Sequence, residues 1–355
     1  MQGDTGREEG QEQGEREEEG QEAVEEEGWG HTLQPLQALT RLIELRLDDL
    51  QPDRPADSPY RITAGMLRST LLKTLVLSGG VQLEPDTLAG KTLLQYLDLD
   101  FTHTVSGGGA EVAQLLSHIQ PLQELTRLRL GDLWAVAPGS SAATAYSALT
   151  ASSKLQRLDI SNCRFPIGVW GNLFPVGRQL SHLQALDISG VQEPTGDRAT
   201  APDGSRLVSC CPSLLAVDLG GLQGLTAERL APLQGLTGLQ GLRFAGSGLT
   251  QEGWQAVCQL TGLRELKLDG TGITRELLVQ ATQLKQLTRF TYKRLAERFD
   301  LVAQVGCRWD IFTPCELCYD PVSAELDISL TQYLLIGLGV FAHALNWLHC
   351  RFGVS

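Results

Sequence analysis

The chain has 355 residues, of which 42% are hydrophobic and 20% charged, enough for one elongated repeat domain or two compact domains. The net charge of −13 and the absence of a basic stripe disfavour nucleic-acid binding. Most of this charge is local. Residues 1–28 hold eleven Glu and one Asp against Arg7 and Arg16, a balance of −10, which leaves −3 for the remaining 327 residues.

The first predicted segment, residues 1–32, is an acidic tail rich in Glu, Gln and Gly. It has too few apolar residues to offset chain entropy by burial, so we expect disorder. It is a solvated tail or, alternatively, attracts a basic partner. No basic stretch followed by an apolar run opens the chain, so no secretory signal is predicted. Eight irregularly spaced cysteines are typical of reduced, buried thiols and favour an intracellular, cytoplasmic location.

Residues 33–295 contain an internal repeat. In "LRELKL" (263–268), the last two leucines alternate with polar residues, which predicts a short strand with one buried face. Turn-forming residues follow, and leucines spaced three and four apart in 273–287 predict a helix. The template L-x-x-L-x-L, with conservative replacements, recurs every 22 to 31 residues, at Leu42, Leu72, Leu94, Leu125, Leu155, Leu183, Leu214, Leu239, Leu263 and Leu287.

Each unit is therefore predicted to form a strand, a turn and a helix, and such units stack into a solenoid because none buries its apolar face alone. The pattern resembles the leucine-rich repeat superfamily; units of 28–31 residues are similar to ribonuclease-inhibitor-like members, and units of 24 residues to shorter types. The resemblance implies an α/β horseshoe of about ten strand-turn-helix units with short parallel strands. The chain departs from the family's consensus at the ninth position, where Cys163, Ser247 and Thr271 are polar but Val191 and Leu222 are not.

In this family the residues between the buried leucines line a concave sheet, which is the usual binding face. The position between the second and third leucines forms one column that begins with Arg46, and its charged members from Asp98 onward are our candidate protein-binding residues: Asp98, Arg129, Asp159, Asp187, Asp218, Arg243 and Lys267. Three aspartates on successive strands, about 4.8 Å apart, repel one another unless they are solvated, paired or used.

An acidic centre flanked by cations would select a protein partner with a basic segment. The alternative is that the aspartates are exposed residues before a turn, partly neutralised by Arg129 and Arg157.

Residues 296–355 break the repeat and are predicted to cap or anchor the array. Within Tyr333–Phe352, the apolar run covers 334–348, shorter than the roughly 20 residues of a membrane span. A helix that caps the open end is therefore preferred; a membrane anchor and an artefact of the gene reading are the alternatives.

A C-x2-C pair, Cys315 and Cys318, suggests zinc. The further ligands would be Cys307 and the adjacent His349 or Cys350, whose spacing suits a metal poorly. We therefore expect reduced cysteines, with no metal and no other cofactor.

No catalytic constellation is visible, because the six histidines are scattered and no nucleophile or zinc-protease motif occurs. We predict a non-catalytic protein-interaction scaffold or adaptor, and by analogy with similar repeats a cytoskeletal or ciliary role. The alternatives are a membrane-tethered receptor or adaptor anchored through residues 333–352, and a substrate-recognition subunit of a ubiquitin ligase. The latter is weakened because residues 1–30 are too polar to form an F-box-like module.

Overall fold

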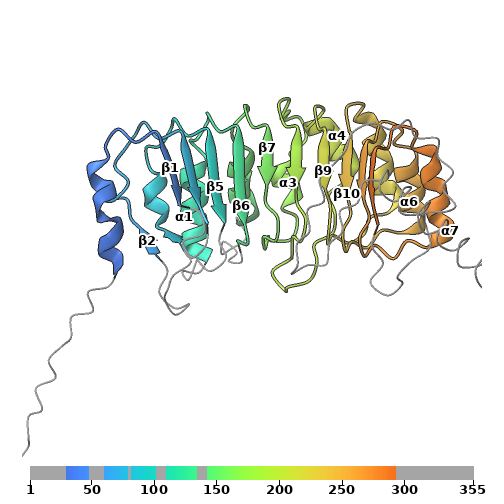
Figure 1. Ribbon diagram of the computed structural model, residues 1–355, viewed down its shortest axis with the longest axis horizontal. Helices are drawn as coiled ribbons and strands as arrows, with labels where there is room; N and C mark the ends of the chain where they lie inside the picture. Colours follow the sequence, from blue (N-terminus) through green and yellow to red (C-terminus); the bar gives the residue numbers. More distant parts are fainter. Residues whose placement is uncertain (1–28, 48–59, 79–80, 101–108, 134–141, 293–355) are drawn as a thin grey trace, which may run out of the picture.

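The computed structural model describes residues 29–292, except 48–59, 79–80, 101–108 and 134–141. In this part of the chain, ten short strands form one parallel sheet whose strand order follows the sequence (Figure 1). A separate two-stranded ladder pairs β2 with β4 in parallel. Because each strand adds beside the preceding one, the described chain is a solenoid, as the repeat predicts.

The sheet strands are short. Each contains the second leucine position of the template, and the longer strands also reach the third. The sheet strands are β1 (Glu44–Leu47), β3 (Thr74–Leu77), β5 (Tyr96–Asp100), β6 (Arg127–Gly131), β7 (Arg157–Asp159), β8 (Ala185–Asp187), β9 (Ala216–Asp218), β10 (Gly241–Arg243), β11 (Glu265–Lys267) and β12 (Arg289–Thr291); the side ladder is β2 (Tyr60–Ile62) and β4 (Val81–Leu83). The register pairs equivalent positions of successive repeats, so one side-chain column runs across the whole sheet.

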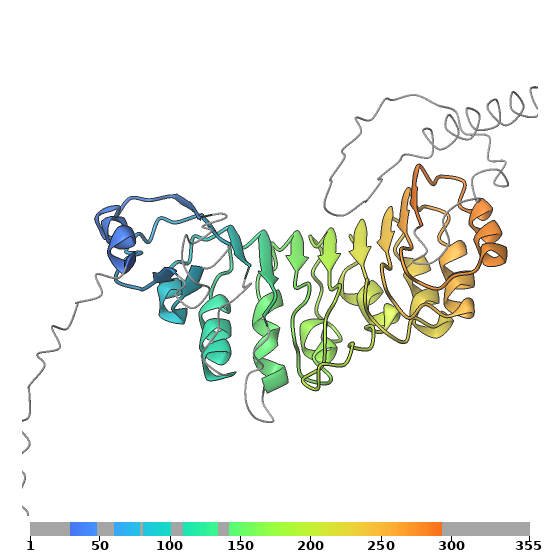
Figure 2. The ribbon, with the colours of Figure 1, turned by 60° about the horizontal axis from the view of Figure 1, so that its bottom comes forward.

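Most helical segments lie on the outer side of the curved stack, opposite the sheet, whereas η1 lies at its N-terminal end (Figure 2). They are η1 (Trp29–Ala38), η2 (Pro85–Leu88), α1 (Gly109–Ile119), α2 (Ala142–Ala145), η3 (Tyr146–Thr150), α3 (Trp170–Leu173), α4 (Gly204–Cys210), α5 (Ala227–Leu230), η4 (Ala231–Gly235), α6 (Gln251–Cys258), α7 (Arg275–Leu278) and η5 (Val279–Gln283). The helix expected over 273–287 is therefore one α-helical turn followed by a 3-10 turn. A 3-10 helix rises further per residue, so a short repeat can span its outer side with it.

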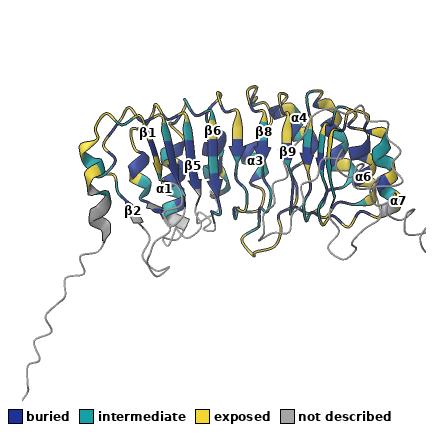
Figure 3. Ribbon diagram, viewed as in Figure 1, coloured by how far each residue is buried: buried dark blue, intermediate teal, exposed yellow. Residues whose placement is uncertain are grey.

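The core is a continuous stack of apolar side chains between the sheet and the outer segments. Eight in-register residues form its central row, each at most 2% exposed: Leu75, Leu97, Leu128, Leu158, Leu186, Val217, Leu242 and Leu266. Figure 3 shows buried residues recurring on strand after strand. Each fully buried leucine contributes roughly 1.5–3 kcal/mol, so the repeated leucines supply the main stabilisation.

Stacked turns extend the hydrogen-bond ladder beyond the strands. The residue that turns each chain has a positive φ, as in Asn162 (56°), Gly190 (65°) and Gly221 (71°). Their amides donate to the following repeat: Asn162 to the carbonyl of Ser189 (2.7 Å), Gly190 to that of Gly220 (2.8 Å) and Gly221 to that of Ala245 (2.7 Å). Glycine and asparagine suit these positions because other residues resist the left-handed conformation.

The ninth position of the repeat is used unevenly. Thr271 Oγ1 donates to the carbonyl of Leu268 at 2.9 Å, and Cys163 Sγ donates to that of Leu130 at 2.8 Å. Ser247 is also buried, but its Oγ has no hydrogen-bond partner among the described residues. Apolar Val191, in contrast, is fully buried in the core.

The predicted boundaries and terminal segments are only partly covered. The first helical segment, η1, begins at Trp29, before the predicted start of the array at residue 33. Residues 293–355 lie outside the described part, and with them the capping, anchoring and zinc predictions. Across the described residues, none of the helices has the length and apolarity needed to span a membrane. The same residues contain no group of three or more His, Cys, Asp or Glu suited to a metal ion.

The stacked turns generate a stability prediction. We expect Gly221→Ala to lower the free energy of unfolding by about 2 kcal/mol, because alanine resists φ of 71° and its Cβ would lie 3.2 Å from backbone atoms of Gly190. The control, Gly246→Ala, has φ of 63° but no atom within 4 Å of the added Cβ, so about 1 kcal/mol is expected. Urea unfolding followed by circular dichroism measures both; equal losses would contradict the close approach of the turns.

A buried lysine generates a second prediction. Lys91 is 5% exposed and occupies the place where other repeats carry buried residues such as Leu122 and Leu236, and burial lowers its pKa below the usual 10.5. We expect Lys91→Met to raise the free energy of unfolding by roughly 0.5–1 kcal/mol at neutral pH, because folding there buries a charge.

The gain should shrink as the pH rises through the lowered pKa towards 10.5, where both folded and unfolded lysine become neutral. Urea titrations at neutral and alkaline pH test this dependence. Lys73→Met, at an exposed lysine of the preceding repeat, is the control and should change little. A gain for Lys91→Met that does not vary with pH would show that the charge is not its cause.

Candidate functional site

The predicted charged column lines up across the concave sheet. Asp98 lies opposite Arg129, and Arg129 lies opposite Asp159. Asp159, Asp187 and Asp218 then face one another on β7, β8 and β9. Next in the column, Asp218 lies opposite Arg243 on β10, and Arg243 lies opposite Lys267 on β11. These residues flank the buried central row within each strand, so the alternation of a strand directs them to the opposite face.

On the N-terminal side of this face, the charges neutralise one another. The Arg129 guanidinium lies between two carboxylates, with Nη1 3.5 Å from Asp98 Oδ1 and Nε 3.3 Å from Asp159 Oδ2. The Tyr96 hydroxyl donates to Asp98 Oδ2 at 2.9 Å, and the Arg46 guanidinium lies 5.7 Å from the centre of the Tyr96 ring. Arg129 thus neutralises part of the column, as the alternative interpretation expected.

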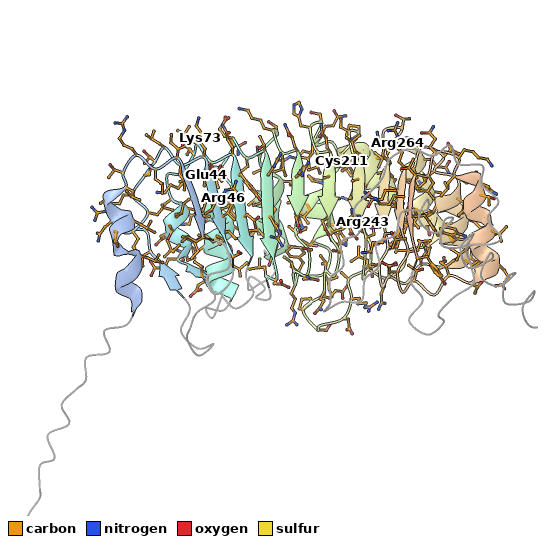
Figure 4. All side chains as sticks on the ribbon, viewed as in Figure 1. Glu44, Arg46, Lys73, Cys211, Arg243 and Arg264 are labelled. Atoms are coloured by element: carbon orange, nitrogen blue, oxygen red, sulfur yellow. The ribbon has the colours of Figure 1, made fainter. Side chains whose placement is uncertain are left out.

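On the C-terminal side, the cations also have partners within the sheet. Arg243 donates to Glu265 Oε1 from Nη2 (2.7 Å) and Nε (3.1 Å). Arg289 Nη1 lies 3.6 Å from Glu265 Oε2, and Lys267 Nζ lies 3.5 Å from Asp269 Oδ2. Figure 4 labels Arg243 on the sheet. These ion pairs leave the flanking cations less available to a partner than the sequence suggested.

Asp187 and Asp218, here called the Asp pair, are different. Neither forms an ion pair with any residue that the structure describes. Each uses Oδ1 to end its strand: Asp187 accepts from Ser189 N (2.9 Å) and Oγ (2.7 Å), and Asp218 accepts from Gly220 N (2.8 Å). Each Asp therefore has a structural role through one oxygen and has no direct ion-pair partner among the described residues.

The pKa values of both residues of the Asp pair are raised. Burial raises the pKa of Asp187, and the neighbouring carboxylates Asp218 and Asp159 add to the increase, although hydrogen bonds from Ser189 oppose it. Burial likewise raises the pKa of Asp218, against the hydrogen bond from Gly220 and the charges of Arg243 and Lys267. The charged form of each is thus less favourable in the folded chain than in the unfolded chain.

A second column, two residues earlier on the same face, was not proposed from the sequence. It places Arg127 opposite Arg157 and continues with Ala185, Ala216 and Gly241. Arg127 and Arg157, here called the Arg pair, are exposed and make no ion pair with a described residue. The expected neutralisation by Arg157 is therefore not observed. Reading this second inter-leucine position beside the first would have revealed the arrangement.

The face can therefore bind charged groups. Four charges that make no direct ion pair with a described residue, the Arg pair and the Asp pair, lie on the four central strands β6 to β9. The second-column residues beside the Asp pair, Ala185 and Ala216, have small side chains. A separate hollow of about 240 Å³, lined by Phe165, Ile167, Trp170, Val191 and Arg229 among others, is formed by the segments that follow β7 and β8 together with Arg229 of α5. It holds one cation and one anion, Arg229 and Glu193, and otherwise mainly apolar walls.

Comparisons with known proteins add the following. No protein-family model and no curated protein sequence matches the chain. Similar solved structures include an internalin from Listeria monocytogenes, at 17% identity and a TM-score of 0.41, covering 72% of this chain and 75% of that one. A TDR receptor is 17% identical with a TM-score of 0.47, and the match covers 74% of this chain and 41% of that one. An LRR protein from Leptospira interrogans is 18% identical with a TM-score of 0.38, and the match covers 73% of this chain and 70% of that one. This chain spans less than half of the TDR receptor chain.

The Asp pair generates a prediction about pH. We expect Asp187→Asn to raise the free energy of unfolding at neutral pH by up to about 1 kcal/mol, because asparagine still accepts from Ser189 without burying a charge. The raised pKa means that the carboxylate lowers stability only once the pH exceeds the unfolded value of 3.8, so the advantage should vanish as the pH falls towards 3.8.

The matched control is Asp98→Asn, which should instead lower stability by about 1 kcal/mol, because Arg129 would lose one of its two carboxylates. Chemical denaturation at neutral and acidic pH measures both variants. If Asp187→Asn were as destabilising as Asp98→Asn, the Asp pair would have to be compensated in the folded chain.

Proposed function

We propose that this leucine-rich repeat solenoid is a non-catalytic scaffold that binds a protein partner on its concave face, and that the Asp pair is the centre of the binding surface. The observation that carries the proposal is the contrast within one column. Asp98, Arg129, Asp159, Arg243 and Lys267 all have ion-pair partners in the sheet, whereas the Asp pair has none among the described residues. A basic group of a partner would supply the missing counter-charge.

The surface is pre-organised for such binding. Consecutive strands and stacked turns are joined by backbone hydrogen bonds, so little ordering of the sheet is needed when a partner docks. Aromatic anchors are few: the Tyr96 hydroxyl is engaged by Asp98, and the Tyr292 hydroxyl donates to the carbonyl of Ile273. We therefore expect charge complementarity to set specificity and association rate, and salt to weaken the complex.

The finer assignment is an adaptor in the cytoplasm, with a cytoskeletal or ciliary assembly as its setting. The cytoskeletal or ciliary part of this assignment rests only on the residue composition of the repeats. The membrane-tethered alternative depends on residues 333–352, which lie outside the described part of the chain. The ubiquitin-ligase alternative depends on a partner that brings the chain to a ligase. A list of bound proteins would separate these alternatives.

The proposal predicts which variant loses its partners. Asp187→Lys with Asp218→Lys should reduce recovery of specific partners at least about tenfold in a quantitative affinity purification of the full chain, because the surface charge changes sign where the partner docks. The control is Glu228→Lys with Glu252→Lys, which makes the same charge change at two exposed residues of the neighbouring outer helices α5 and α6.

We expect the wild type and the outer-face variant to retain a set of proteins that the concave variant loses. Thermal melting must first show that both variants keep the fold. A folded concave variant with unchanged partner recovery would refute binding through the Asp pair.

A further inference from the structure

The concave-face charges that have no direct ion-pair partner among the described residues have opposite signs and are separated in space. The Arg pair lies on β6 and β7, and the Asp pair lies on β8 and β9, so the change of sign falls between β7 and β8. Arg157 is opposite Ala185, two residues before Asp187 on the adjacent strand, yet it forms no ion pair there. The two pairs are therefore neighbours that do not neutralise one another.

The register fixes the separation of the two charged pairs. The midpoints of the pairs are two strands apart, about 9.6 Å across the sheet, and two residues apart along the strands, about 6.7 Å. Together these displacements give roughly 12 Å between backbone positions. Because the guanidinium groups are long and mobile, partner charges about 10–12 Å apart can meet both pairs. Side chains alternate between two faces in a β-strand, so residues three positions apart there would not both face the sheet. A polyproline II segment, with three residues per turn and about 3.1 Å per residue, places such residues on one face about 9 Å apart, and the length of the side chains covers the rest.

We propose that the partner presents a bipolar segment, with an acidic residue for the Arg pair and a basic residue, roughly three positions away, for the Asp pair. This inference rests on the proposed binding through the concave face and adds the chemistry of the partner. Ala185, Ala216 and Gly241 have no side chain long enough to stand between such a segment and the sheet. The segment would therefore cross the strands in close contact with them.

A uniformly charged segment fits this surface less well. A basic run long enough to cover β6 to β9 would bring its cations against the Arg pair while satisfying the Asp pair. An acidic run would have the opposite conflict. Juxtaposed like charges discriminate strongly against wrong partners. The surface therefore selects for the order of two opposite charges rather than for total charge, which extends the sequence-based expectation of a basic segment.

The experiment uses random short peptides displayed on phage and selected on the immobilised full chain. Two variants are compared with the wild type: Arg127→Glu with Arg157→Glu, and Asp187→Lys with Asp218→Lys. The control is Lys73→Glu with Arg264→Glu, which makes the same charge change as the first variant at two exposed residues just before the strands (Figure 4). Melting curves establish that each variant is folded.

We expect selected peptides to carry an acidic and a basic residue about three positions apart, and to bind each concave variant roughly tenfold more weakly than the wild type or the control. Reversing the basic residue of a peptide should restore binding to the Asp187→Lys, Asp218→Lys variant. Reversing the acidic residue should restore binding to the Arg127→Glu, Arg157→Glu variant. Such pairwise rescue distinguishes contact from general electrostatic attraction, because each charge is matched to one partner.

The remaining outcomes would overturn either the bipolar segment alone or the proposed function as well. Peptides that depend on the Asp pair but not on the Arg pair would overturn the bipolar segment and leave the proposed function standing. Dependence on the Arg pair alone, or selected peptides that ignore both pairs, would overturn the proposed function as well. Failure to select any peptide that binds the wild type more tightly than it binds the two concave variants would have the same consequence.

Discussion

The structure depends on one constraint: each repeat must place its strand in register with the preceding one. Parallel strands in chain order place an apolar residue, most often leucine, at each equivalent position, so Leu158 lies between Leu128 on one neighbouring strand and Leu186 on the other. A shift by one residue would turn the buried leucines outwards. The same register brings the polar positions between the leucines into columns. The proposed binding surface is therefore a product of the requirement that stabilises the core.

This constraint explains how much the sequence alone could predict. The leucine spacing was sufficient for the parallel solenoid, the strand positions and the column that contains Asp187 and Asp218. It was insufficient for the pairing of charges, because pairing depends on side-chain reach. Arg129 extends to carboxylates on both neighbouring strands, whereas Arg157, which looked equally suitable, reaches neither Asp159 nor Asp187 in an ion pair. Periodicity contains no information on that difference.

The outer side of the array was harder to predict for a related reason. Leucines spaced three and four apart are compatible with both α-helical and 3-10 turns, and the length of the repeat does not select between them, because the 24-residue unit that begins at Leu239 forms the eight-residue α-helix α6. In the 24-residue unit that ends at Leu287, a single α-helical turn is followed directly by η5. The ninth position shows the same limit, since Thr271 bonds the turn but buried Ser247 does not, although both have a hydroxyl.

The strand-ending hydrogen bonds of the aspartates have a consequence for how this surface can change. Because Asp187 and Asp218 each support their own turn through one oxygen, their spacing is tied to the repeat and not to adjustable loops. Distances between charges on the face can therefore change only in whole strand steps of about 4.8 Å. Insertion of one repeat between β7 and β8 would lengthen the distance between the Arg pair and the Asp pair while preserving both pairs. The binding preference of such an array can thus evolve through the number of repeats between the two charged pairs, while the residues of each pair stay the same.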